Sequence, residues 1–222
     1  MMSWRTVTAR CLPMSLLVAV CLMTAACDPP SSAPPSEQPT TAAPEPLGAP
    51  RDGMPGTLEE LLAQGGEVAR SWQSGARVSE LFIELDEGRD WAGAQLTYLG
   101  PGADRMLVVT ITPEGTGQER PTLATLGLSA VSPEGLGEVP APDGLAEPDA
   151  LIEAAAGVLE SCGASGGPSG LLYATGAPIS WDAGAGAWSA PPVWTATVFA
   201  SGAGGAALDP SSGAPVGDGC VD

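Results

Sequence analysis

Histidine and lysine are both absent from this chain of 222 residues. Without histidine there is no Ser-His-Asp or Cys-His catalytic arrangement, no imidazole metal ligand and no histidine proton shuttle. Without lysine there is no Schiff base, no Ser-Lys dyad and no phosphate-loop lysine. These absences remove most catalytic constellations, and the acid–base or cation chemistry that remains belongs to carboxylates.

Positive charge is scarce as well. The chain has 8 basic residues, all arginine, against 26 acidic ones, and its formal net charge is −18 at pH 7. A polyanion of this kind repels phosphate backbones and anionic lipid head groups, and it has no basic patch to overcome that repulsion. We therefore predict no nucleic-acid partner, and no motif in the sequence indicates a cofactor.

The N-terminal residues have the pattern of an export signal. Arg5 and Arg10 lie in a short segment without acids, and an apolar run follows from Cys11 to Met23. This run is shorter than the roughly 20 apolar residues that a membrane-spanning helix needs. The pattern therefore favours a cleaved signal over a membrane span.

The end of this signal, Thr24-Ala25-Ala26-Cys27, resembles the lipobox of bacterial lipoproteins. The resemblance implies a signal peptide over residues 1–26 and an acylated Cys27 as the first residue of the mature protein. Membrane lipid would then be one partner, through the acyl chains, and the protein would be anchored to the bacterial cell envelope, at the inner or the outer membrane. An ordinary signal peptide, with Cys27 as an incidental thiol, is the alternative.

The segment from 27 to 56 has a composition unlike that of a folded domain. Nine of the 29 residues after Cys27 are proline, and most of the others are serine, threonine, alanine or acidic. The segment offers no apolar periodicity that could bury a face. It is therefore predicted to be a disordered tether that holds a domain away from the membrane.

The remaining cysteines form an even pair. Cys11 and Cys21 leave with the signal and Cys27 carries lipid, so Cys162 and Cys220 are left in an oxidising compartment. A disulfide between them is the predicted arrangement. A two-cysteine metal site is the alternative, although structural zinc needs four nitrogen or sulfur ligands.

Residues 57–115 have the pattern of a helix followed by strands. Thr57 and Glu60 form a capping box that opens a helix ending at Trp72. Gly65-Gly66 weakens the middle of this helix by about 2 kcal/mol relative to alanine. Alternation and β-forming residues then predict strands over 78–85, 91–99 and 105–112.

A similar order returns after a Gly/Pro-rich connector over 116–146. Pro148 lies in the first turn of a predicted helix that ends at Cys162. Predicted strands at 170–175, 193–200 and 206–209 follow, with a tryptophan-bearing hairpin at 179–189 between the first two. We therefore predict an α+β fold of two successive helix-plus-antiparallel-meander units, 57–115 and 147–222.

The end of the second unit resembles the PepSY-like family. Units of this family close on a strand and an Asp-x-x-Thr/Ser-Gly turn, which Asp209, Ser212 and Gly213 match, while Pro215 shifts the following spacing by one residue. The resemblance implies an exported, wedge-shaped and usually non-catalytic domain. Such domains are associated with inhibition of proteases or with holding partner proteins.

Three tryptophans are candidate binding residues. Trp181, Trp188 and Trp194 lie beside Gly/Pro-rich turns within 14 residues. Such a cluster could line a groove for a sugar or a peptide. The alternative is a small core or a hairpin staple.

The densest acidic cluster consists of Asp86, Glu87 and Asp90. Asp and Gly form turns readily, so a solvated hairpin turn is the predicted role. A calcium site or a catalytic role of these carboxylates is the alternative.

Together these features predict a membrane-anchored extracytoplasmic lipoprotein. Its domain would act as a non-catalytic binding or scaffold module for an unknown protein or glycan of the cell envelope. A PepSY-like regulator or inhibitor of an exported protease is the first alternative. A carboxylate-dependent glycan hydrolase of the cell envelope is the second.

Overall fold

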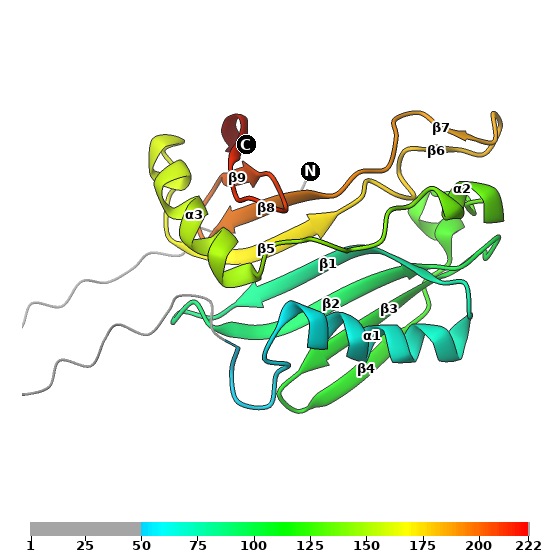
Figure 1. Cartoon of the computed structure of the whole chain (residues 1–222), viewed down its shortest axis with the longest axis horizontal. Coiled ribbons are helices and arrows are strands. Elements are labelled where there is room, and N and C mark those ends of the chain that lie inside the picture. Colours follow the sequence, from blue (N-terminus) through cyan, green and yellow to red (C-terminus); the bar gives the residue numbers. More distant parts are fainter. Residues whose placement is uncertain (1–49, 222) are drawn as a thin grey trace, which may run out of the picture. The chain divides into compact units, whose positions relative to one another are not determined.

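Eight strands pair into one antiparallel sheet in the computed structural model, which describes residues 50–221. Their order across the sheet is β10-β9-β8-β5-β1-β2-β3-β4 (Figure 1). The strands are β1 (Arg77–Leu85), β2 (Trp91–Leu99), β3 (Met106–Thr112), β4 (Gly115–Glu119), β5 (Pro168–Ala174), β8 (Thr195–Ala200), β9 (Gly205–Leu208) and β10 (Pro215–Val221). The predicted α+β class with antiparallel strands is confirmed.

The middle of the sheet joins two stretches of chain that are far apart in sequence. Strand β1 pairs with β5, so that Leu81 lies opposite Tyr173 and Ile83 opposite Leu171. Strands β2 to β4 continue the sheet on one side of this pair, and β8 to β10 continue it on the other. The strands of residues 57–115 and of 147–222 therefore belong to one sheet.

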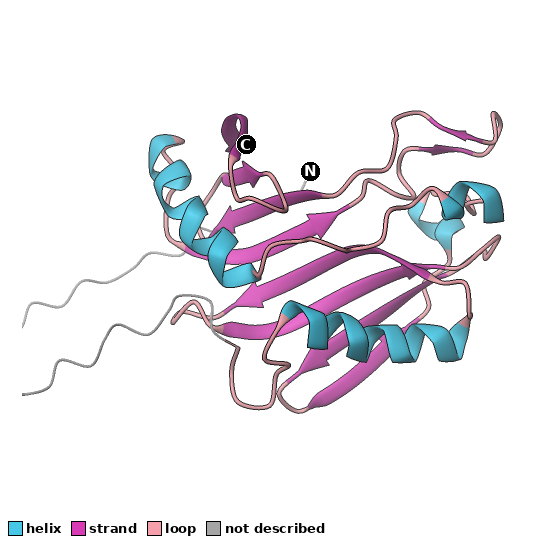
Figure 2. Cartoon of the chain, in the orientation of Figure 1, coloured by secondary structure: helices cyan, strands magenta, loops and turns pink. Residues whose placement is uncertain are grey.

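Two helices lie on the same face of the sheet, α1 (Leu58–Trp72) and α3 (Pro148–Ser161) (Figure 2). The Thr57 hydroxyl accepts a hydrogen bond of 3.1 Å from the backbone N–H of Glu60, as the predicted capping box requires. One core cluster contains buried residues of both helices and of the strands beneath them. Its members include Leu61, Leu81, Ile83, Leu96, Val109, Leu151, Ile152, Leu171 and Val198.

A second, smaller cluster covers one end of the opposite face. Leu99 and Met106 pair across β2 and β3 and, by alternation, point away from the helices. They pack with the short helices η1 (Leu123–Leu126) and α2 (Pro133–Gly137) and with the hairpin of β6 (Trp181–Asp182) and β7 (Ala187–Trp188). Part of the predicted connector, residues 116–146, therefore forms a second layer on this face of the sheet.

Residues 138–147 form an irregular segment with a turn at Asp143-Gly144, here called the strap, which leads from α2 to α3. The strap crosses the helix-covered face between α1 and α3 (Figure 1). Pro140 and Pro142 have no backbone N–H, and this keeps the segment out of a helix. Because of the strap, the space between the two helices is partly filled.

Two strands of the sheet differ from the prediction. Residues 115–119, predicted to end the first unit and begin the connector, form the edge strand β4, and residues 215–221 form the edge strand β10. Both sequences, GTGQE and PVGDGCV, are rich in glycine and poor in regular alternation, so neither has a recognisable strand pattern. Pairing with β3 and β9 gives them their structure.

The boundary of the predicted tether also differs. Pro50 forms a parallel bridge with Trp91, and Arg51 makes an ion pair with Asp86. Residues 50–56 therefore belong to the folded domain. Residues 1–49, with the predicted signal peptide and Cys27, lie outside the described residues.

Within residues 50–221, no helix combines the length and the apolar character needed to cross a bilayer.

Candidate functional site

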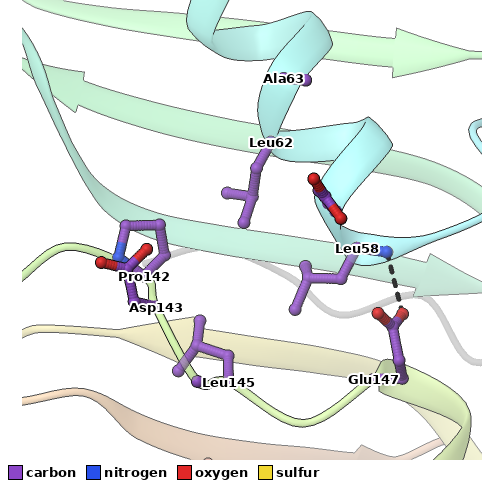
Figure 3. A pocket seen from close by; sticks show the side chains of 9 residues that line it. Leu58, Leu62, Ala63, Pro142, Asp143, Leu145 and Glu147 are labelled. Carbon is purple, nitrogen blue, oxygen red and sulfur yellow. Dashed lines mark hydrogen bonds between the residues drawn. The ribbon is translucent and has the colours of Figure 1, made fainter.

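A cavity of about 510 Å³ lies between the first turns of α1 and the strap (Figure 3). Leu58, Leu62 and Leu145 give it an apolar floor. Its other lining residues are Glu59, Ala63, Pro142, Asp143, Gly144 and Glu147. The lining thus contains three carboxylates and no basic side chain.

A second cavity of about 190 Å³ adjoins the first and continues along α1. The two cavities share Leu62 and Pro142, and the second also contacts Gly66, Tyr98 and Pro140. We call the two cavities together the α1–strap groove. It runs between α1 and the strap, with Glu59 and Glu147 beside the start of α1 and Asp143 on the strap. Its second part is also lined by the basic residue Arg77.

Glu147 positions the strap against α1. Its carboxylate oxygen Oε2 accepts a hydrogen bond of 2.9 Å from the backbone N–H of Leu58 (Figure 3). This N–H belongs to the first turn of a helix and has no acceptor within the helix. A negative charge is also favoured at this end of a helix. The end of the strap is therefore fixed to the start of α1.

Two aromatic side chains fix the strap through hydrogen bonds to its backbone carbonyls. The Tyr173 hydroxyl donates a hydrogen bond of 2.7 Å to the carbonyl of Ala146, and Trp194 Nε1 donates one of 3.0 Å to the carbonyl of Ala141. Burial raises the pKa of Tyr173, and the nearby charges of Glu147 and Asp149 raise it further. Tyr173 therefore stays a neutral donor, and the groove has a fixed wall.

The inner end of the groove contains a buried polar group. Tyr98 is 4% exposed, and within the described residues its hydroxyl has no hydrogen-bond partner. Burial raises the pKa of this hydroxyl, so it is neutral. The groove thus joins an acidic first cavity to a second cavity that is lined mostly by apolar residues, by Arg77 and by this buried hydroxyl.

The three candidate tryptophans are divided between the two core clusters. Trp181 and Trp188 belong to the second cluster, where their rings meet edge-on with centroids 4.9 Å apart. Trp188 Nε1 also donates to the carbonyl of Gly135 at 3.3 Å. Trp194 instead packs against the main core and holds the strap. The three tryptophans do not form one surface. The contacts of Trp181 and Trp188 are those of the alternative, a small core or a hairpin staple, and those of Trp194 are with the main core and the strap.

The acidic cluster has the local contacts of a turn. Asp86 pairs with Arg51, and its Oδ1 accepts a hydrogen bond of 3.0 Å from the backbone N–H of Asp90. This hydrogen bond is the largest cause that lowers the pKa of Asp86, and Arg51 lowers it further. Across residues 50–221, no three acidic or cysteine side chains converge as the ligands of a metal would. The structure therefore gives Asp86, Glu87 and Asp90 no common ligand position.

Cys162 and Cys220 are joined in a disulfide, as the even cysteine count predicts. The bond connects the end of α3 with β10, and the two Cα atoms lie 5.5 Å apart. It stabilises the last strand against the helix.

The residues of the α1–strap groove were not predicted as a site. Glu147 and Asp143 lie in or beside the Gly/Pro-rich connector, where no spacing links them to Leu58 or Leu62. The one relevant sequence signal is the acid directly before Pro148, at the start of α3. It does not indicate that Glu147 contacts a different helix.

Comparison with known proteins adds little to this geometry. No protein-family model matches the chain, and no curated protein matches it either. A solved structure, that of a "putative lipoprotein" from Clostridium difficile 630, is similar over 70% of this chain and 89% of its own, with a TM-score of 0.43 and 11% sequence identity.

Proposed function

We propose that this protein is a lipid-anchored envelope lipoprotein whose domain binds a basic segment of a partner protein in the α1–strap groove, without catalysing a reaction. The observation that carries the proposal is the lining of the first cavity of the groove, whereas Arg77 lines the second. Three leucines form the floor of the first cavity and three carboxylates, Glu59, Asp143 and Glu147, surround its mouth. An arginine or lysine side chain matches this lining, because its aliphatic stem suits the leucines and its charge suits the carboxylates.

The overall charge of the chain supports a basic partner. The formal net charge is −18, and the groove lies in the part of the chain that carries nearly all of the acidic residues. A field of this sign raises the association rate of a positively charged segment and disfavours acidic competitors.

The exposure of the carboxylates supports binding over glycan hydrolysis. A glycosidase needs one carboxyl group whose pKa is raised by burial, close to a second one. Glu59, Asp143 and Glu147 are all exposed. Burial does raise the pKa of Glu80. Glu84, which is on the same face of β1, lies four residues away, which is about 13 Å along a strand. Paired acids of glycosidases are about 5–9.5 Å apart.

We further propose that the two halves of the sheet are PepSY-like copies of one unit. Helix α1 precedes β1 to β4, and α3 precedes β5, β8, β9 and β10, with β1 and β5 adjacent at the centre. The turn between β9 and β10 supports the resemblance. Asp209 Oδ1 accepts hydrogen bonds from the backbone N–H groups of Ser211 and Ser212, and Gly213 has a φ of 72°.

Binding of defined peptides tests the groove. The full chain, solubilised in detergent, is titrated with a fluorescent peptide of alternating leucine and arginine and with a matched leucine–glutamate peptide. We expect only the basic peptide to bind, and Asp143→Asn to weaken it about two- to fivefold, the range of an exposed ion pair. Glu160→Gln removes an exposed acid of α3 and serves as the control. Equal binding of both peptides, or equal effects of the two variants, would contradict the proposal.

Metabolic labelling tests the anchor. Cells that produce the chain are grown with an alkynyl fatty acid, and the protein is examined for the label. We expect labelling of the wild type and its loss in Cys27→Ser, because the thiol is the acylation site in the lipobox resemblance. Equal labelling of the two would refute lipid attachment at Cys27.

A further inference from the structure

The two cavities of the α1–strap groove have linings of opposite charge. Three carboxylates and no basic residue line the first cavity. Arg77, the first residue of β1, lines the second cavity together with Tyr98, and the remaining lining residues are apolar or glycine. The sign of the charge therefore changes along the groove.

A second arginine lies beside the second cavity. Arg70 is one helical turn after Gly66, and its Nη1 lies 3.3 Å from the position that a Cβ on Gly66 would take. Gly66 itself lines the cavity. The charge of Arg70 also acts on Tyr98, because it opposes the rise that burial causes in the pKa of the hydroxyl. Two guanidinium groups thus contribute positive charge to this cavity.

These donors have no carboxylate partner in the part of the chain that the structure describes. Among residues 50–221 the one ion pair joins Arg51 and Asp86. In the same range, the neutral Tyr98 hydroxyl has no acceptor. Two of the six arginines of residues 50–221 therefore lie at one small cavity, in a chain whose net charge is −18. A carboxylate matches this cavity, because it accepts charge-assisted hydrogen bonds from guanidinium groups.

We propose that the second cavity of the α1–strap groove binds an acidic side chain of the partner segment, next to the basic side chain that occupies the first cavity. This inference rests on the proposed function and makes it more specific. A segment with both charges gains an attractive contact in each cavity, whereas a uniformly basic segment meets Arg77 in the second. The groove thus selects the order of charges along its partner.

The length of the groove sets the spacing of the two side chains. The two cavities adjoin and share Leu62 and Pro142. Glu59 and Gly66, the first and last α1 residues among those argued here, are seven positions apart, or about 10 Å along the helix axis. The centres of the cavities are closer together than that. In an extended peptide, side chains at positions i and i+2 lie on one face and about 7 Å apart. We therefore expect one residue between the basic and the acidic position.

Peptides with one basic residue test the second cavity. The full chain in detergent is titrated with fluorescent, terminally blocked peptides that contain Arg-Leu-Glu or Glu-Leu-Arg, and with matched peptides in which glutamine replaces the glutamate. In one of the two orders, we expect the glutamate peptide to bind about three- to tenfold more tightly than its glutamine counterpart. Fluorescence anisotropy measures the affinities.

Variants of the arginines locate this preference. Arg77→Gln should remove most of the preference for glutamate and leave the affinity for the glutamine peptide nearly unchanged. Arg70→Gln should reduce the preference less, because Arg70 lies beside the cavity. Arg105→Gln removes an exposed arginine that lines neither cavity, and it should retain the full preference. Circular dichroism checks that each variant is folded.

The outcomes separate this inference from the proposed function. If the glutamine peptides bind but glutamate adds nothing in either order, the acidic position is refuted and the binding of a basic side chain stands. An equal preference for glutamate in Arg77→Gln and Arg105→Gln would also overturn the inference. If none of the peptides binds, the proposed function fails and the inference fails with it.

Discussion

Glu147 accepts a hydrogen bond from the backbone N–H of Leu58, a residue 89 positions earlier in the chain. The Glu147 side chain, at the start of α3, thereby provides a hydrogen-bond acceptor for a backbone N–H at the start of α1. Removing it in Glu147→Ala leaves a part-buried N–H without its acceptor, which should lower the free energy of unfolding by about 1–2 kcal/mol. Urea denaturation measures this. Glu147→Gln retains an acceptor oxygen and should lose less; a loss as large as that of the alanine variant would contradict a hydrogen-bonding role.

The two adjacent glycines of α1 should respond in opposite ways to alanine. A Cβ at Gly65 would lie 2.7 Å from the Tyr98 hydroxyl and 2.8 Å from a methyl group of Leu96. A Cβ at Gly66 would meet only the end of the flexible Arg70 side chain, at 3.3 Å. We expect Gly66→Ala to raise the free energy of unfolding by about 0.5–1 kcal/mol through helix propensity. We expect Gly65→Ala to lower it by about 1–3 kcal/mol through overpacking.

Thermal and urea denaturation of the two variants side by side measure this difference. Because both changes gain the same helix propensity, the comparison isolates the contact of α1 with β2. Similar stabilisation by both would show that α1 does not approach β2 as closely as Gly65 indicates.

The turn at Asp209 should make the fold sensitive to acid. Hydrogen bonds, the largest from the Ser212 hydroxyl and the next from that of Ser211, lower the pKa of Asp209 to about 2. Because the pKa is lower in the folded chain, its contribution to stability is present above the unfolded value of about 3.9 and is lost as the pH falls towards 2. Asp209→Asn should therefore reduce the fall in melting temperature over that interval.

The cause of this pKa shift can be measured directly. In Ser212→Ala the pKa of Asp209, followed by carboxyl NMR, should rise towards its ordinary value, because the largest donor is gone. Ser211→Ala should have a smaller effect in the same direction. An unchanged pKa in both variants would rule out the hydroxyl groups as its cause.

The disulfide should contribute a large part of the stability. Cys162 and Cys220 are separated by 58 residues. Closing a loop of that length stabilises a fold by about 4 kcal/mol in the chain-entropy description, so reduction should lower the melting temperature by roughly 10 °C. Melts with and without reductant measure the shift, and the Cys162→Ala/Cys220→Ala variant controls for effects of the reductant. Reaction of both thiols before reduction would refute the bond.

Trp188 should act as a packing residue of the β6–β7 hairpin. It meets Trp181 edge-on and donates a hydrogen bond to Gly135. Trp188→Ala should therefore lower the free energy of unfolding by about 3 kcal/mol, whereas Trp188→Phe retains most of the ring contact and should cost less. Circular dichroism melts distinguish the two. A melting temperature unchanged in Trp188→Ala would favour the predicted binding role of this residue.

The sequence by itself determined the elements whose patterns are local. The capping box of Thr57 and Glu60 marked the start of α1, and Pro148 marked that of α3. Alternating apolar residues located β2 at Trp91–Leu99. The even cysteine count indicated the disulfide. Each of these signals depends on neighbouring residues in the chain or on a residue count. None of them requires knowledge of the fold.

Only the tertiary structure decided which distant residues meet. The strands β4 and β10 have little intrinsic preference for extended structure and form by pairing at the sheet edges. The difference between Gly65 and Gly66, equal by helix propensity, arises from the packing of α1 on Leu96 and Tyr98. The contact of Glu147 with Leu58, and with it the α1–strap groove, depends on the path of the strap across the sheet. Local pattern carries no information about such long-range contacts, because they are set by how the two helices share one sheet.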